Sequence, residues 1–194
     1  MVASKQRRPP SRCRQLLRRP RRQRAGGRSP VLKTFLEITD PASLRAPERA
    51  PQRAFGLERV HDPALNRWFY ENVGVDWQWT DRLDWTDEQW ERWEARVETW
   101  AVIVDGERAG YYELEPHPAG GLVQLAYFGL LAPFQGLGIG GHALTAAIRR
   151  GFELGPKVAV STNSSDGPHA LANYEARGMR VLRREPGRVD GSRP

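Results

Sequence analysis

The amino-acid sequence predicts an α/β (α+β) domain, with a mixed central sheet of about six to seven strands flanked by about four helices. Two observations support this fold class. From Val123 onward apolar residues recur at every second position, as in a strand. Ala132-Pro133 and a glycine run follow, and after them apolar residues recur at helical spacing up to Phe152. A strand meander precedes this unit, with Asp105-Gly106 as its hairpin signal.

The first third of the domain contains two predicted strands, each closed by an Asp-Pro dipeptide. They span Val31–Thr39 and Phe55–Val60. With Asp62 as N-cap and Pro63 in the first turn, a helix is expected to run to about Asn72. Its buried side should carry Leu65, Trp68 and Phe69.

A second helix is predicted to begin at Thr86, because Thr86–Gln89 matches a capping box. Its apolar face should contain Trp90, Trp93 and Val97. Strands at 99–104 and 109–115 follow around the hairpin turn.

The last third alternates between strand and helix. Lys157–Thr162 is expected to form a short buried strand. A helix should start at Asp166-Gly167-Pro168 and be capped by Gly178, before a closing strand over Met179–Arg184.

Charge divides the chain into a basic tail and a domain. Residues 1–28 contain eleven Lys and Arg and no acid, which leaves 19 basic against 23 acidic residues, a net charge of −4, from residue 29 on. We expect a disordered tail at 1–30, one domain at 31–186 and a flexible tail at 187–194. The basic tail suits nucleic-acid phosphates, but we favour a solvated tail or an over-long reading frame as its explanation.

The number and positions of the cysteines and histidines limit the metal sites and the redox environment that the sequence predicts. The single cysteine, Cys13, lies in the basic tail, and the four histidines show no metal-ligand spacing, so we expect no metal site and a reducing, cytoplasmic location. No apolar stretch has the length of a signal peptide core or a membrane span.

The glycine run after the strand predicts an anion site, because unpaired N–H groups and the helix dipole favour a phosphate there. Gly136, Gly138 and Gly141 satisfy the dinucleotide pattern G-x-G-x-x-G, but no acidic residue follows about 20 positions on. Gln135, Gly138 and Gly140 satisfy a second pattern, Q-x-x-G-x-G. A tight turn without a ligand is the third interpretation.

QGLGIG at Gln135–Gly140 and YEARGM at Tyr174–Met179 resemble two motifs of the GNAT superfamily of acyl-CoA-dependent N-acetyltransferases. The element order and the motif spacing also resemble that fold, from about residue 31 to 185. The segment DRLDWTDEQW followed by VDGERAGYYEL is similar to a bacterial subgroup whose substrates are mostly unassigned. The resemblance implies acetyl-CoA as co-substrate.

The resemblance also assigns site residues. Gly129, Leu130 and Leu131 would pair with the pantetheine arm, and Tyr174 would protonate the departing thiolate. Gly167 stands where a typical motif has asparagine. The pyrophosphate would be held by Gln135, Gly136, Gly138, Ile139, Gly140 and Gly141.

A base and an amine pocket can be sought among the remaining residues. Glu113 is the predicted base, with Glu115 behind it, because a carboxylate can take a proton from an ammonium substrate. All seven tryptophans fall between Trp68 and Trp100, among many acids. Since aromatic rings beside carboxylates suit a cation, the predicted substrate residues are Trp77, Trp79 and Tyr127.

The sequence therefore predicts transfer of an acetyl group from acetyl-CoA to a primary amine of a small molecule or peptide by direct attack. Two alternatives remain: a non-catalytic acyl-CoA-binding module, and a nucleic-acid-associated protein acting through residues 1–28. The acceptor and the oligomeric state, a homodimer included, are left open.

Overall fold

The computed structural model describes residues 31–77 and 79–187 and places its strands in one seven-stranded sheet, in the order β2-β3-β4-β5-β6-β1-β7. Neighbouring strands are antiparallel, except that β5 and β6 are parallel. The predicted mixed sheet is thereby confirmed. The strands are β1 (Leu32–Ile38), β2 (Phe55–Val60), β3 (Glu98–Val104), β4 (Glu107–His117), β5 (Leu122–Leu130), β6 (Val158–Asn163) and β7 (Arg180–Pro186).

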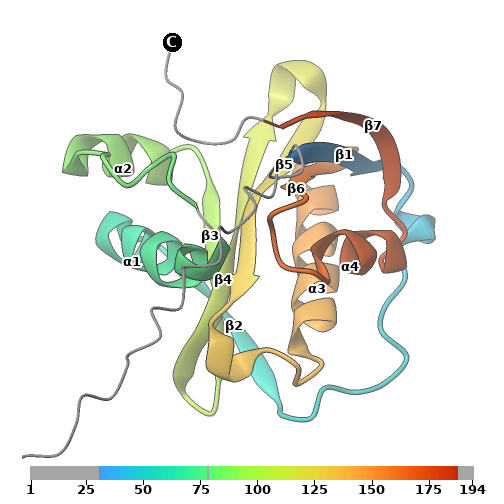
Figure 1. Ribbon diagram of the computed structural model, residues 1–194, viewed down its shortest axis with the longest axis horizontal. Helices are drawn as coiled ribbons and strands as arrows, with labels where there is room; N and C mark the ends of the chain where they lie inside the picture. Colours follow the sequence, from blue (N-terminus) through green and yellow to red (C-terminus); the bar gives the residue numbers. More distant parts are fainter. Residues whose placement is uncertain (1–30, 78, 188–194) are drawn as a thin grey trace, which may run out of the picture.

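Two helices cover each face of the sheet (Figure 1). On one face lie α1 (Pro63–Gly74) and α2 (Asp87–Glu94), and on the other α3 (Ile139–Leu154) and α4 (Ala170–Ala176). The largest core cluster lies between α3 and the sheet, and it includes Leu36, Leu125, Leu144 and Ile148.

The local signals of the sequence have the expected effects. The Asp62 carboxylate accepts from the N–H of Ala64 at 2.9 Å, and the Thr86 N–H donates to Gln89 Oε1 at 2.8 Å, so both helices begin as predicted. Asp105 (φ 49°) and Gly106 (φ 81°) form the hairpin turn in left-handed backbone.

One burial prediction on α1 is wrong. Phe69 is fully buried and stacks on Tyr111 with ring centroids 5.0 Å apart, but Trp68 is 38% exposed. The buried residues of α1 include Asn66, Phe69, Tyr70 and Val73, which recur at helical spacing, and Trp68 lies outside the face that they form.

The N-terminal strand lies inside the sheet. β1 pairs with β6 on one side and β7 on the other, both antiparallel. The first strand of the described chain therefore joins the closing strand to the rest of the sheet.

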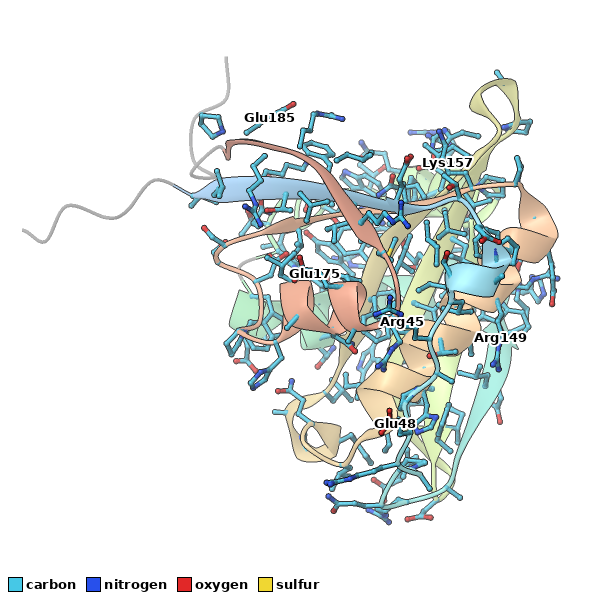
Figure 2. The ribbon with its side chains drawn as sticks, turned by 90° about the vertical axis from the view of Figure 1, so that its right-hand side faces the viewer. Arg45, Glu48, Arg149, Lys157, Glu175 and Glu185 are labelled. Carbon is cyan, nitrogen blue, oxygen red and sulfur yellow. The ribbon has the colours of Figure 1, made fainter. Side chains whose placement is uncertain are left out.

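The connection from β1 to β2 crosses the face that carries α3 and α4 (Figure 2). Arg45 donates its N–H to the Arg177 carbonyl at 3.2 Å, and Gln52 donates its N–H to the Leu137 carbonyl at 2.9 Å. This Pro-rich connection therefore packs against the turn before α3 and the end of α4.

The predicted tails and Cys13 lie outside the described residues, apart from Gly187. None of the described helices combines the length and the apolarity that a membrane crossing requires.

The interior position of β1 can be tested by comparing two leucines on that strand. Leu36 is fully buried, whereas Leu32 is 40% exposed. Leu36→Ala should lower the free energy of unfolding by about 2–5 kcal/mol because it leaves a cavity, and Leu32→Ala should cost well under half of that. Urea denaturation measures both; equal losses would contradict the interior position.

Candidate active site

The site starts where β5 and β6 separate. Their parallel pairing runs only from Val123 with Val158 to Leu125 with Val160. β5 continues to Leu130 and β6 to Asn163 without pairing to each other. The two strands therefore open into a V, and their backbone groups inside it can be offered to a ligand.

A β-bulge decides which backbone groups of β5 point into the V. Glu113 of β4 pairs with Tyr127, but the next residue, Leu114, pairs with Leu125, so Ala126 is the extra residue. The N–H of Leu131 donates to the Ala109 carbonyl at 2.9 Å, which turns Leu131 toward β4. Gly129 shares that direction because hydrogen-bonding direction alternates along a strand.

The alternation leaves Phe128 and Leu130 with their backbone N–H and C=O groups directed away from β4. Of the three residues that the resemblance assigned to the pantetheine arm, Leu130 alone therefore points its backbone into the V. Phe128, which was not among the predicted residues, also points its backbone into the V, because the bulge at Ala126 shifts the alternation and has no sequence signal here.

The glycine turn connects β5 to α3. Gly136 and Gly138 both have φ of 76°, a left-handed backbone that favours glycine, and Gly138 is the N-cap of α3. The Gln135 side chain donates to the Leu130 carbonyl at 2.9 Å and so ties the turn to the end of the strand. The N-terminus of α3 consequently lies at the open end of β5.

The glycines of the turn serve two purposes. A side chain at Gly141 would collide with Arg177, and Pro47 of the connection lies 3.0 Å from the same position. Around Gly136, in contrast, nothing lies within 4 Å of an added Cβ, and this residue lines the cavity described below. Gly141 therefore admits the β1–β2 connection, and Gly136 keeps space open.

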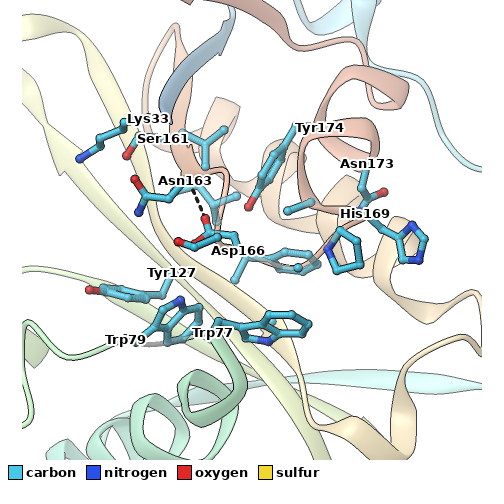
Figure 3. A pocket seen from close by; sticks show the side chains of 18 of the residues that line it. Lys33, Trp77, Trp79, Tyr127, Ser161, Asn163, Asp166, His169, Asn173 and Tyr174 are labelled. Carbon is cyan, nitrogen blue, oxygen red and sulfur yellow. Dashed lines mark hydrogen bonds between the residues drawn. The ribbon is translucent and has the colours of Figure 1, made fainter. Parts of the chain in front are cut away.

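A cavity of about 1230 Å³ occupies the V and extends toward the α1–α2 loop (Figure 3). Such a volume exceeds the roughly 300–1,000 Å³ of most single-ligand pockets, so two reactants could fit together. Leu131, Gly138, Ile139 and Glu113 are absent from its lining. The predicted residues that it brings together are Trp77, Trp79, Tyr127, Gly129, Leu130, Gln135, Gly136, Gly140, Gly141 and Tyr174.

Tyr174 lies on α4, and its side chain borders this cavity (Figure 3). The residue is almost completely buried, and burial raises the pKa of its phenol above the ordinary 10, with the nearby Asp166 charge adding to the effect. Within the described part of the chain, no residue hydrogen-bonds with its hydroxyl. Tyr174 therefore keeps its proton and can donate it to a bound ligand.

Glu113 lies outside the cavity in a buried network. Its side chain is fully buried, and Oε2 accepts from Arg82 Nη1 at 3.1 Å and from Trp93 Nε1 at 2.8 Å. Burial raises the pKa of Glu113, while Arg82 and Trp93 oppose the rise. Glu115 likewise pairs with Arg96 and with His117. The predicted base role of Glu113 stays a prediction, and its contacts are those of a structural ion pair.

The three predicted substrate residues form one wall. Trp79 and Tyr127 are in edge contact with ring centroids 4.6 Å apart, and Trp79 also lies 3.7 Å from the Cβ position of Gly129. Trp77 reaches across to the β6–α4 loop, where its ring lies 3.3 Å from the Cβ position of Gly167. The glycine at 167 thus leaves room for the Trp77 indole.

Sequence reasoning missed two carboxylates of the cavity. Asp166 accepts from the Thr162 hydroxyl at 2.6 Å and the Asn163 N–H at 2.8 Å, and so orders the β6–α4 loop. Asp81 accepts from the hydroxyl groups of Tyr70 and Tyr127. The cluster of acids around the tryptophans was visible in the sequence, but nothing there distinguished Asp81 from its neighbours.

Comparison with known proteins agrees with this architecture. The model of the acetyltransferase (GNAT) family matches residues 62–179. A search of curated proteins gave no match. The chain belongs to the GNAT acetyltransferase family.

Solved structures show the same fold at low sequence identity. A GCN5-related N-acetyltransferase from Kribbella flavida has a TM-score of 0.55 and 18% identity, over 78% of this chain and 56% of that one. One from Sphaerobacter thermophilus has a TM-score of 0.55 and 20% identity, over 81% and 50%. This chain therefore matches little more than half the length of those two proteins.

A Bacillus subtilis acetyltransferase solved in complex with CoA has a TM-score of 0.54 and 20% identity, over 67% of this chain and 79% of that one. Identities this low establish a common fold and leave the activity and the acceptor of this chain open.

The structural role of Glu113 can be tested by Glu113→Gln. The exchange leaves the buried Arg82 charge without its closest partner, so the free energy of unfolding should fall by about 3 kcal/mol or more. Glu107→Gln removes an exposed carboxylate from the same strand and should stay within about 0.5 kcal/mol of wild type. An unchanged unfolding free energy combined with an altered pH–rate profile would instead favour the base role.

Proposed function

We propose that this protein transfers the acetyl group of acetyl-CoA to a primary amine by direct attack of the amine. The single observation that carries the proposal is one cavity that joins the diverging β5–β6 strands, the N-terminus of α3 and the Tyr174 hydroxyl. Together these supply backbone partners for an extended chain, a site for phosphates and a proton donor.

The site fits the shape and charge of acetyl-CoA, which would supply an activated thioester. The backbone groups of Phe128 and Leu130 would bind the pantetheine arm. The N–H groups around Gly136, Gly140 and Gly141 would face the pyrophosphate, where the α3 dipole favours negative charge. Because Gly136 has no side chain, the phosphates can approach the backbone.

Tyr174 would protonate the leaving sulfur, and the proton that the attacking nitrogen loses would return to the phenolate through solvent. The phenol is protonated throughout the physiological pH range, and burial raises its pKa further above that range, so the proton is present when the thiolate departs. The amine would attack the thioester directly, without a covalent enzyme intermediate; the one cysteine of the chain, Cys13, precedes the family-matched region, which therefore contains no thiol nucleophile. We also propose a cytoplasmic location, on the sequence argument alone.

Binding and turnover can be separated experimentally. A thermal-shift titration with acetyl-CoA, with NADPH as control, should show stabilisation by about 2.7 kcal/mol at 100 times the Kd, or about 5 °C or more. Release of free thiol upon addition of amines then measures transfer. Stabilisation without thiol release for any amine would instead indicate a non-catalytic acyl-CoA-binding module.

Tyr174→Phe tests the proton donor. We expect kcat to fall by about 10²–10⁴-fold, while the thermal shift with acetyl-CoA is preserved. Tyr112→Phe serves as control, because Tyr112 is a buried core phenol that is absent from the cavity lining. Equal rates for Tyr174→Phe and wild type would remove Tyr174 from the mechanism.

A further inference from the structure

The α1–α2 loop places the carboxylate of Asp81 at the edge of the cavity. The positive charge next to this carboxylate does not fully balance the negative charge around it. Arg82 is 5% exposed, lies 3.1 Å from Glu113 Oε2 and 4.0 Å from Asp81 Oδ2. One guanidinium thus stands between two carboxylates. Glu113 is fully buried, but the Asp81 side chain is 60% exposed and lines the cavity. The excess negative charge is therefore located at Asp81.

Asp81 is also held in one orientation. Tyr70 donates to Oδ1 at 2.9 Å, and the Tyr127 hydroxyl lies 2.8 Å from Oδ1 and 2.7 Å from Oδ2. Two tyrosines from different elements, α1 and β5, fix the carboxylate while more than half of its surface stays accessible. A fixed carboxylate loses little conformational freedom when it binds a cation.

The other lining carboxylates have local partners. Asp166 accepts from Thr162 and Asn163, and Glu185 pairs with Arg183 at 2.6 Å. Asp81 also accepts from the two tyrosine hydroxyls, but it shares the Arg82 guanidinium with Glu113, and that guanidinium lies over the rings of Trp93 at 3.8 Å and Tyr127 at 4.3 Å. Because its side chain is 60% exposed and lies beside an aromatic wall, Asp81 is the lining carboxylate best suited to a cation from outside the protein.

The ring faces beside Asp81 are suited to the same cation. Arg82 lies over the inner aromatic residues, whereas no Lys or Arg of the described chain lies over Trp77 or Trp79. A positive group at Asp81 would lie on the same wall as Trp79, which contacts Tyr127, and would gain from the quadrupole of that indole. The aromatic wall stands across the cavity from Tyr174 (Figure 3).

We propose that Asp81 binds a positively charged group of the acceptor, remote from the nitrogen that is acetylated. The acceptor is then an aliphatic amine with a second ammonium group: one end reacts near Tyr174, and the other is held by Asp81 on the wall formed by Trp79 and Tyr127. This inference rests on the proposed acetyl transfer and identifies its substrate class.

The test compares two amines with the same five-carbon chain, 1,5-diaminopentane and pentylamine, which differ in the second ammonium group. In thiol-release assays with acetyl-CoA, wild-type kcat/KM should be about 10- to 100-fold higher for the diamine, the value of one charge-assisted contact. Asp81→Asn should remove this preference, because it should lower kcat/KM for the diamine and leave kcat/KM for pentylamine unchanged. Asp76→Asn, which removes an exposed carboxylate from the same loop that is absent from the cavity lining, should keep the preference.

A binding measurement separates this inference from the acetyl transfer itself. Without acetyl-CoA, calorimetric titration of wild type should show tighter binding of 1,5-diaminopentane than of pentylamine, whether or not any amine is acetylated. Equal binding and equal kcat/KM for the two amines would overturn the role of Asp81 and leave acetyl transfer intact. The wild-type comparison does not depend on the folding of any variant. If Asp81→Asn lowered kcat/KM equally for both amines, the assignment of the second ammonium group to Asp81 would also be overturned.

Discussion

The candidate active site depends on the short parallel pairing of β5 and β6. Because pairing ends at Leu125 and Val160, the sheet opens while both strands are still extended. The bulge at Ala126 turns the following backbone groups of β5 toward the opening, and α3 starts where β5 ends. A longer ladder would close the cavity with main-chain hydrogen bonds, since a β-strand edge pairs with whatever strand lies beside it. The opening is therefore the structural basis of the proposed cofactor site.

The aromatic network around Arg82 supports the wall of the cavity that Trp79 and Tyr127 form. A buried guanidinium is costly unless it is paired, and here Glu113 pairs with it while Trp93 both stacks on it and donates to the same carboxylate. This network joins the α1–α2 loop to β4, and so fixes the position of Asp81 beside Tyr127. The tryptophan-rich segment thus contains two groups of residues, one packed around Arg82 and one lining the cavity.

The predictions that rest on neighbouring residues, such as helix caps and turns, were correct. The Asp62 cap, the Thr86 capping box and the Asp105-Gly106 turn were correct because neighbouring residues suffice to form them. The glycine motif likewise lies at the strand-to-helix turn that it predicts. The prediction that Trp68 is buried was wrong, because an apolar side chain on a helix is buried only where a partner surface faces it.

The sequence by itself determined the α/β class, the order of the elements, the GNAT resemblance and the glycine turn, since periodicity, caps and turn residues act over a few positions. Only the tertiary structure decided that β1 lies between β6 and β7, that Glu113 is buried against Arg82, and that Asp81 borders the cavity. Each of these depends on contacts between residues distant in the chain. A single sequence does not reveal such contacts, because strand pairing and ion pairing are selected by the packing of the whole sheet.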